Sequence, residues 1–546
     1  MDEHSNFGSK QIVAVSLLLC FTSFFIILFF LYPTYHSADD NYLLYEMSGA
    51  LGNGPTNLLH YNYTWHPYLT YLLKRLFQTF PGQNWYSICL YSLHFISWFC
   101  LVTVILRRLS FKLALLLILL FFVVFEAQLL LRITYTNTSI ILGIAALIYL
   151  GDKILLEKRL TLPNLLNPFL LLVIASMLRP HVLIPLIAVF LVLLPMFSIR
   201  RIVFIGLVFS LALCSFLVLN AAHEEYYKRN IPAWSSKEAY RQAVVNFDNH
   251  SKQLDTTRLT PKQILQKQWL ENGILIDTSF LTTADIRNIT NTRRKLARRL
   301  AVKTELYWLF TNNRLFILTS AGILFFSVVL SKRSNQKKAI LILQALAVFA
   351  ICTFLLLFMK LPYYLFPALL FFYSLCCMLP FMSNQEGLTF HVTRRYLMLA
   401  FCIGCISWGG VRLHKLSKEN TEGQKAFTNA WQEISRNSDK LFIAPYFSIP
   451  LDDLGVFTSP LRHPMTNVVF KNSLMNHGHE KTYQRFGINS AKDLFISRNV
   501  RFLSPNTHLI QKYFELHYGQ KLVSIRPAEN YKHLMVTELH IETGVH

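Results

Sequence analysis

The stretch QIVAVSLLLCFTSFFIILFFLY, residues 11–32, is followed after PTYH by SADDNYLLYEMSGALGNGPTNLLHYNYTWHPYLTYLL, residues 37–73. The first segment is long enough to cross a bilayer core of about 30 Å. Asp39 and Asp40 therefore lie within about two helical turns of one membrane face. Together the two segments predict a membrane helix that leads into an acidic site lying flat on the membrane.

The residues after the acidic pair predict two amphipathic helices joined by a glycine-rich loop. His66-Pro67 opens the second helix, because proline is favoured in a first helical turn. Apolar residues recur on one side of the first helix at helical spacing. These apolar positions are Leu43, Leu44, Met47 and Leu51.

A structural explanation of the acidic pair competes with a functional one. Ser37-x-x-Asp40 resembles a capping box, and acidic side chains are favoured at a helix start by the macrodipole. For the pair taken alone, we weigh the two explanations about equally. The organisation of the whole chain favours the functional one.

Composition places the chain among multi-pass membrane proteins. Of its 546 residues, 53% are hydrophobic and only 15% are charged, and mean hydropathy is +0.35. The net charge of +23 lies largely in short loops between apolar runs, which excludes a nucleic-acid partner and indicates membrane orientation and anionic lipid. All nine cysteines fall inside apolar runs, so we expect neither a disulfide framework nor a metal site built from them.

Hydropathy predicts about eleven transmembrane helices, and we expect the third to sixth to be short. Alternate short loops are basic, from Arg107-Arg108 to Arg394-Arg395, so the N-terminus is predicted to be cytoplasmic. Residues 11–32 form a retained signal anchor in this scheme. The predicted spans are 11–32, 84–106, 111–126, 138–152, 164–178, 181–197, 202–221, 314–331, 339–359, 361–381 and 396–411.

The same orientation places two long loops and the C-terminal tail outside the cytoplasm. We predict a transmembrane domain over residues 1–411, with outer loops 33–83 and 222–313. Residues 412–546 are polar and combine strand-like and helical stretches, which predicts a separate α/β-type domain. The expected fold is therefore an all-α membrane protein with a C-terminal extracytoplasmic α/β domain.

Several cations near the outer membrane face are not explained by orientation. Charged groups at that depth are costly and are usually paired or functional, although each one can also reach a lipid phosphate. As a group they predict a phosphate-binding cavity. The candidates are His66, Lys74, Arg75, Arg132, Arg179, His181 and Lys360.

Two clusters in the tail carry weaker signals. Asp452-Asp453 lies beside a proline and is interpreted as a turn rather than a second catalytic pair. His477-Gly478-His479-Glu480 has metal-binding side chains, but no further ligands follow at a typical spacing. Glu126, at the outer end of the third span, could be a second acidic group of the site, but an interfacial carboxylate is the favoured interpretation.

The acidic pair after the first span, followed by a His-Pro element, resembles the GT-C superfamily of membrane glycosyltransferases. Aminoarabinose transferases and protein O-mannosyltransferases are examples of that superfamily. The chain also resembles a set of uncharacterised bacterial multi-pass membrane proteins with DD followed by a short helix and SGxxG. Asp39-Asp40 stands at the acidic motif of the superfamily. His66-Pro67-Tyr68-Leu69 resembles its second element, with one proline lost, and Ser48-Gly49 matches the start of SGxxG.

The resemblance implies transfer of a sugar from a polyprenyl-phosphate donor to a hydroxyl outside the cytoplasm. Asp39 would be the general base, and Asp40 would orient it, cap the helix or share a metal. Arg132, Arg179 and Lys360 would stabilise the phosphate, with Arg179 first, while His66 would bind the acceptor or hold the loop. No cofactor is required, and a divalent cation is left open.

The acceptor class and two other functions stay open at this stage. A glycan, a lipid or a protein could accept the sugar. A transporter or flippase of lipid-linked sugars would use the same cations without chemistry, and a polysaccharide polymerase would not need the aspartate. Transporters usually show internal repeats and polar groups near the bilayer midplane, and this sequence shows neither.

Overall fold

The first apolar stretch forms one helix, α1 (Ser9–Phe30), in the computed structural model of the chain. The chain divides into two compact units, each assembled from segments that are distant in sequence. Unit 1 comprises residues 1–34, 87–222 and 303–420, and unit 2 comprises residues 35–86, 223–302 and 421–546. The structure describes residues 8–59, 65–156, 162–251, 254–275, 277–292, 298–328, 335–358, 361, 364–378, 392–444, 448–470, 479–503, 506–527 and 531–542.

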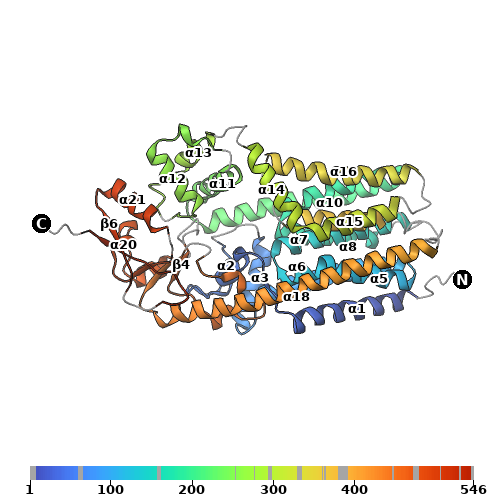
Figure 1. The fold of residues 1–546 in the computed structure, drawn as a ribbon, viewed down its shortest axis with the longest axis horizontal. Helices are drawn as coiled ribbons and strands as arrows, with labels where there is room; N and C mark the ends of the chain where they lie inside the picture. Colours follow the sequence, from blue (N-terminus) through green and yellow to red (C-terminus); the bar gives the residue numbers. More distant parts are fainter. Residues whose placement is uncertain are drawn as a thin grey trace. The chain divides into compact units, whose positions relative to one another are not determined.

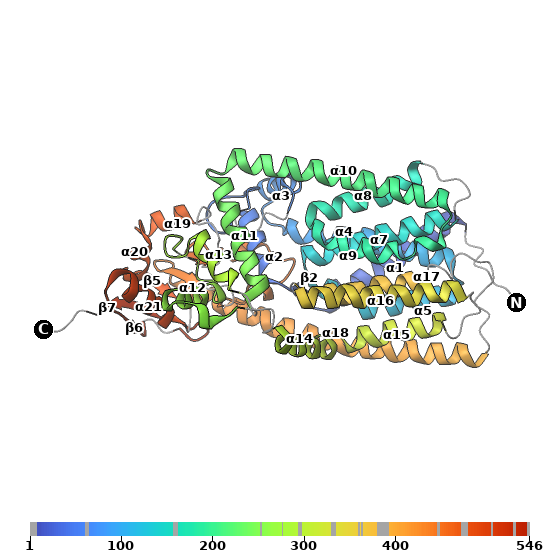
Figure 2. The ribbon, with the colours of Figure 1, turned by 90° about the horizontal axis from the view of Figure 1, so that it is seen from above.

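Unit 1 is a bundle of apolar helices that run roughly parallel (Figures 1 and 2). All eleven predicted spans correspond to apolar helices in the described part of the chain. Seven of these are long enough to cross a membrane, or eight if a pair bent by 74° is one span, and three are shorter. After α1, the elements are α4 (Trp85–Arg108), α5 (Phe111–Phe121), the π-helix η1 (Phe122–Glu126), α6 (Ala127–Leu131), β2 (Arg132–Ile133), α7 (Tyr135–Leu156), α8 (Leu162–Leu178), η2 (Pro180–Val182), α9 (Leu183–Leu191), η3 (Leu194–Met196), α10 (Ile199–Asn230), α14 (Arg298–Asn312), α15 (Arg314–Val328), α16 (Asn335–Phe358), α17 (Leu365–Met378) and α18 (Val392–Arg436).

Two of the four helices expected to be short are longer than predicted. The third span continues past Glu126 as far as Leu131, because the Glu126 carboxylate is buried against the His94 ring of α4. The fourth begins at Tyr135, since the polar residues before position 138 form its first turn. The fifth and sixth are short as expected, and the backbone break at Arg179 separates them.

The outward faces of the unit 1 helices carry large apolar side chains. Phe29 of α1 is 72% exposed, and Val203 and Val218 of α10 are also exposed. In water such a band would drive association, whereas it matches the hydrocarbon core of a bilayer. Neighbouring helices pack tightly: a Cβ atom on Gly322 of α15 would collide with the Phe401 ring of α18, and these two helices lie side by side (Figure 2).

A buried ion pair joins α4 to α7. Arg107 and Arg108 were predicted to orient the protein by their charge, but both contact the fully buried Asp152 carboxylate. Arg108 also donates from Nη2 to the Asp152 carbonyl at 2.8 Å, and its side chain is almost completely buried. Breaking such a pair leaves a buried charge without compensation.

Replacement of Asp152 by Asn is expected to destabilise unit 1 by about 2–3 kcal/mol, because the amide keeps one hydrogen bond but loses the charge that offsets Arg108. Thermal unfolding of the full chain in detergent measures the effect. The double variant Asp152→Asn with Arg108→Met should recover part of the loss, because the buried Arg108 charge is removed and only Arg107, whose side chain is 32% exposed, loses its ion pair. An Asp152→Asn variant as stable as the native chain would contradict this account.

Unit 2 gathers both long loops and the tail into one body. Within the chain, α18 is a single helix of 45 residues that continues through position 412. After β1 (Thr34–Tyr35), the elements of unit 2 are α2 (Ala38–Ser48), α3 (Pro67–Thr79), α11 (Trp234–His250), η5 (Thr256–Arg258), α12 (Pro261–Glu271), α13 (Thr283–Asn291), β3 (Leu441–Ala444), η7 (Leu451–Asp453), η8 (Pro460–Arg462), β4 (Val468–Phe470), α19 (Glu480–Arg485), α20 (Ala491–Ile496), β5 (Val500–Phe502), α21 (Thr507–Tyr518), β6 (Leu522–Ile525) and β7 (Glu538–Ile541).

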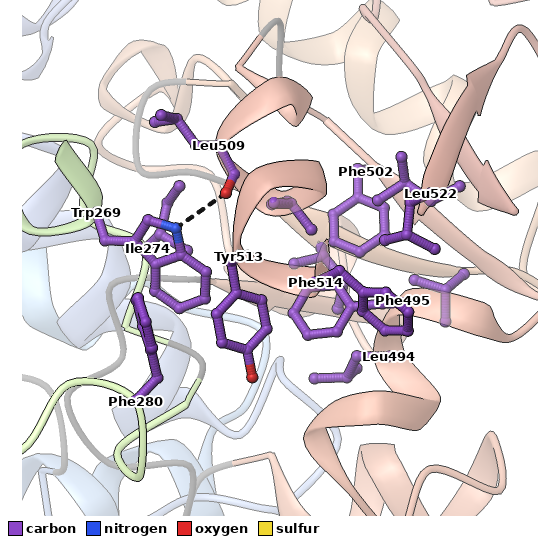
Figure 3. Packing of buried hydrophobic residues seen from close by; sticks show 14 of the residues in the cluster. Trp269, Ile274, Phe280, Leu494, Phe495, Phe502, Leu509, Tyr513, Phe514 and Leu522 are labelled. Atoms are coloured by element: carbon purple, nitrogen blue, oxygen red, sulfur yellow. Dashed lines mark hydrogen bonds between the residues drawn. The ribbon is translucent and has the colours of Figure 1, made fainter. Parts of the chain in front are cut away.

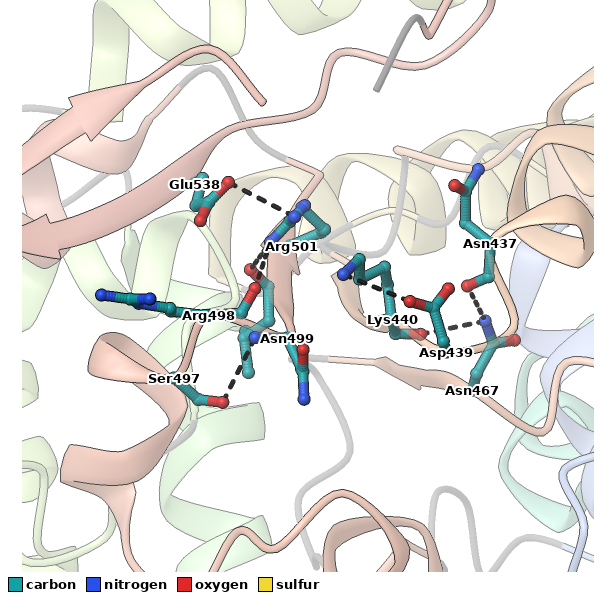
Figure 4. Close-up of polar contacts among 10 residues, drawn as sticks. Asn437, Asp439, Lys440, Asn467, Ser497, Arg498, Asn499, Arg501 and Glu538 are labelled. Carbon is teal, nitrogen blue, oxygen red and sulfur yellow. Dashed lines mark hydrogen bonds and ion pairs between the residues drawn. The ribbon is translucent and has the colours of Figure 1, made fainter. Parts of the chain in front are cut away.

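The tail contains the predicted α/β fold. Strand β3 lies between β4 and β5 and is parallel to both, while β6 and β7 form an antiparallel pair. Polar side chains tie the ends of these elements together (Figure 4). Asn467 donates to the carbonyls of Asn437 and Lys440 at 3.2 and 3.0 Å, and the Arg501 guanidinium lies 3.3 Å from the Glu538 carboxylate.

One hydrophobic core joins the second long loop to the tail (Figure 3). Trp269 of α12 is completely buried, packs on the Phe280 and Tyr513 rings, and donates from Nε1 to the Leu509 carbonyl at 3.3 Å. The Tyr513 hydroxyl donates to the Asp277 carboxylate. Residues 223–302 therefore fold together with the tail, and not as a separate loop.

The Asp277–Tyr513 hydrogen bond predicts how stability varies with pH. Burial alone would raise the pKa of Asp277, but hydrogen bonds from Ser279 and Tyr513 hold it below its ordinary value. Burial, followed by the bond to Asp277, raises the pKa of the Tyr513 hydroxyl. The Asp277 contribution is therefore fully present above the unfolded pKa of about 4, and that of Tyr513 below about 10.

Stability of the full chain is expected to fall below about pH 4, as protonation of the folded carboxylate removes the Asp277 contribution. It is also expected to fall above about pH 10, because Tyr513 ionises in the unfolded chain at a lower pH than in the folded one. Thermal unfolding measured across this pH range tests both the loss of stability in acid and the loss in alkali. An Asp277→Asn variant should be less stable at neutral pH and should lose stability less steeply in acid. If its loss of stability below about pH 4 equalled that of the native chain, Asp277 would not be the group responsible.

Candidate functional site

The acidic pair lies in the first turn of α2. Ser37 caps this helix, since its Oγ accepts a hydrogen bond from the Asp39 backbone N–H at 3.2 Å. Gly49 ends the helix with a left-handed backbone conformation (φ +80°), which glycine adopts without steric cost. The capping function that the sequence suggested for Ser37 is therefore present, and Asp39 and Asp40 sit where the macrodipole favours negative charge.

The two aspartates differ in environment. Asp39 is half-buried, whereas Asp40 is completely buried. The Tyr86 hydroxyl, at the start of α4, donates to Asp40 Oδ1 at 2.6 Å. The Tyr86 ring in turn stacks on Trp65 at 5.1 Å between centroids. Asp40 is therefore held in place by an aromatic stack, while Asp39 is the more accessible carboxylate of the pair.

This stack connects the two sequence motifs. Trp65 immediately precedes His66, so the aromatic contact brings the His-Pro element to the acidic turn. His66 caps α3: its Nδ1 accepts from the Tyr68 backbone N–H at 3.3 Å, and Pro67 occupies the first turn. The buried His66 ring also meets the His223 ring at 5.7 Å. His66 thus orders the loop, which is one of the two functions the sequence suggested for it.

Lys74 lies on α3, after His66 and Pro67, and belongs to the same unit. Its Nζ donates to Asn57 Oδ1 at 3.3 Å, and the Asn57 amide donates to the Tyr226 hydroxyl at 2.5 Å. Tyr226 lies in the last turns of α10, which belong to unit 2. The ammonium of Lys74 is therefore held beside the loop that joins α2 to α3.

Arg132 and Arg179 belong to unit 1. Arg132 forms an ion pair with Glu419 at 2.8 Å and donates to Asn420 at 3.1 Å. Arg179 donates to the Tyr135 and Thr136 hydroxyls at 3.1 and 2.6 Å, and its guanidinium lies over the Tyr135 ring. Hydroxyls and rings orient the Arg179 guanidinium, and a carboxylate pairs with Arg132.

The structure therefore brings together only part of the predicted site. Asp39, Asp40, His66 and Lys74 share unit 2, and Arg132 and Arg179 share unit 1. Lys360 lies outside the described residues. The predicted cavity that would join these groups stays a proposal.

Two contacts in the structure were not predicted from the sequence: the one between His94 and Glu126, and the hydrogen bond from Tyr86 to Asp40. His94 Nδ1 and Glu126 Oε1 lie 2.7 Å apart, both completely buried between membrane helices. Glu126 was interpreted as an interfacial carboxylate, which is wrong because its side chain has no contact with solvent. Tyr86 carries no motif signal, since its role depends on a contact with a residue 46 positions away.

The described residues were compared with the side-chain clusters that bind metal ions in proteins. No group of three or more His, Cys, Asp or Glu side chains there could hold an ion. His477 and Gly478 of the suspected cluster lie outside the described residues, and His479 contacts Tyr42. Asp452 and Asp453 belong to a short 3-10 turn after Pro450, and the Asp453 carboxylate packs against Gly423.

Comparison with known proteins found solved structures but no sequence relatives. No family model matches the chain, and no curated protein matches it by sequence. The chain is similar to ArnT from Cupriavidus metallidurans bound to undecaprenyl phosphate, with 11% identity, a TM-score of 0.43, and coverage of 97% of this chain and 98% of that chain. ArnT from the same organism in the apo state gives 11% identity, a TM-score of 0.40, and coverage of 96% and 97%.

Proposed function

We propose that this chain is a membrane glycosyltransferase that moves a sugar from a polyprenyl-phosphate donor to an acceptor hydroxyl outside the cytoplasm. One observation carries the proposal: Asp39, a half-buried carboxylate, lies nine residues after Phe30, the last residue of a membrane helix, and next to a second carboxylate that accepts a hydrogen bond from Tyr86. A base that accepts a hydroxyl proton must be both accessible and fixed. Asp39 meets the first requirement, and Asp40 with Tyr86 supplies the second.

The assignment of groups follows from their charges and contacts. Asp39 would accept the proton of the attacking hydroxyl, which then forms a bond to the anomeric carbon as the phosphate leaves. Arg179 is the first candidate to stabilise the departing phosphate, because its charge is oriented by hydroxyl groups and rings. Arg132 is a weaker candidate, since Glu419 already offsets its charge. A monophosphate needs no metal if such cations surround it, and a divalent cation is left open.

Localisation follows from the same proposal. The apolar helices would place the chain in a bacterial cytoplasmic membrane, with the N-terminus cytoplasmic and the C-terminal domain extracytoplasmic. Lipid would surround the exposed apolar faces of unit 1, and the prenyl chain of the donor would enter from the bilayer. The acceptor could be an envelope glycan, a lipid or a protein.

The test uses the purified full chain reconstituted in liposomes. Undecaprenyl-phosphate hexoses and pentoses with labelled sugars serve as probes, since undecaprenyl phosphate is the lipid bound in the similar ArnT structure, and envelope fragments serve as acceptor. We expect label to leave the lipid and enter the acceptor, with release of undecaprenyl phosphate. Label that changes leaflet while the sugar–phosphate bond stays intact would indicate a flippase and would overturn the proposal.

A further inference from the structure

Tyr42 links the acidic turn to the C-terminal tail. It follows Asp39 by three residues on α2, so the two side chains project from the same face of the helix. The buried Tyr42 hydroxyl lies 3.1 Å from Nε2 of His479, whose ring is completely buried. The Tyr42 ring also meets Phe470, the last residue of β4, edge to face at 5.2 Å.

His479 is itself fixed by the fold of the tail. It is the N-cap residue of α19, and its carbonyl accepts a hydrogen bond from the Tyr483 backbone N–H at 2.9 Å. Its ring packs near the Tyr483 ring, at 6.5 Å between centroids. A side chain 437 positions from Tyr42 is therefore held rigidly against the face of α2 that carries Asp39.

We propose that His479 is a positioning residue for sugar transfer: its hydrogen bond to Tyr42 sets the rotation of α2 and thereby the direction of the Asp39 carboxylate. This inference rests on the proposed function of Asp39. A general base must be held within about 0.5 Å of the productive geometry, and a displacement of about 1 Å costs on the order of a hundredfold in rate. The tail is then part of the catalytic unit and not only a module for recognition.

The chain offers a matched control on the same helix. Tyr45 is also buried, and its hydroxyl donates to the His463 carbonyl in the tail at 2.9 Å. Tyr45 follows Asp39 by six residues and therefore projects from a different side of α2. Loss of the Tyr45 bond weakens the contact between α2 and the tail without acting on the Asp39 face.

The test compares turnover in the liposome assay, with whichever undecaprenyl-phosphate sugar of the panel is transferred. Tyr42→Phe and His479→Phe are each expected to lower turnover about tenfold to a hundredfold, with KM for the donor changed less than about twofold. The double variant should lose no more than either single one, because both remove the same bond. His479→Gln keeps a side-chain donor and acceptor and should recover most of the turnover.

Tyr45→Phe should keep turnover within about twofold of the native chain while lowering its thermal stability about as much as Tyr42→Phe does. Equal loss of turnover in Tyr45→Phe, additive losses in the double variant, or native turnover in His479→Phe would each overturn the positioning function. Asp39→Asn separates the two levels of inference. If Asp39→Asn is inactive and His479→Phe is fully active, only the positioning inference fails, whereas an active Asp39→Asn variant removes the proposed function.

Discussion

Replacement of Asp39 by Asn is expected to lower sugar transfer by about a thousandfold while the chain still folds and binds undecaprenyl phosphate. A general base contributes on the order of 10² to 10⁴ in rate, and an amide cannot accept the hydroxyl proton. Asn has nearly the same shape, so the change leaves the packing of α2 intact, and loss of the favourable interaction with the macrodipole costs about 0.3–1 kcal/mol. Turnover and lipid binding are measured separately, by the liposome assay and by native mass spectrometry.

Ser37→Ala is the matched control for Asp39→Asn. It removes the N-cap of the same helix and should cost about 0.5–2 kcal/mol of stability, but it leaves both carboxylates in place. Under the structural explanation of the acidic pair, both variants would lower stability and neither would abolish transfer. A Ser37→Ala variant as inactive as Asp39→Asn would show that the helix start, and not the base, limits the reaction.

Trp269→Ala is expected to destabilise unit 2 by about 3–5 kcal/mol, enough to unfold it at moderate temperature. The indole is completely buried between Phe280 and Tyr513, so truncation leaves a large cavity and also removes the hydrogen bond to Leu509. Because the long loop and the tail share this core, protection from hydrogen exchange should fall in both. Hydrogen exchange with mass spectrometry on the full chain measures this.

Trp308→Ala provides the comparison for Trp269→Ala. Trp308 is 63% exposed on α14, so its truncation removes the same side chain without opening a cavity. It should change unfolding by less than about 0.5 kcal/mol. If Trp269→Ala raised exchange only in α12 and left α21 protected, the long loop and the tail would not share a single cooperative core.

Local pattern was sufficient for much of the fold. Each predicted span has an apolar helix, and the predicted starts at Ser37 and His66 are observed as helix caps. The strand-like and helical stretches expected in the tail also occur, for example as β3 (Leu441–Ala444) and α21 (Thr507–Tyr518). These features depend on hydrophobic runs and on residues within one helical turn, which a sequence displays directly.

Partners of polar side chains were not predictable in the same way. Glu126 looked interfacial because the pattern shows its depth in the span but not the His94 ring on another helix. Arg108 looked like an orientation signal because Asp152, its partner, is 44 residues away. Spacing in sequence gives no distance between helices, so the difference between a lipid-facing cation and a paired one is decided by packing.

The sequence by itself determined a helical membrane protein with an acidic turn directly after its first span and an α/β tail. Only the tertiary structure decided that residues 35–86, 223–302 and the tail form one body, that Tyr86 buries Asp40, and that His479 reaches Tyr42. The physical reason is range: hydropathy and helix capping act over one or two turns of chain, whereas these contacts close loops of tens to hundreds of residues. Such contacts are selected by the burial of a shared core, which no local pattern records.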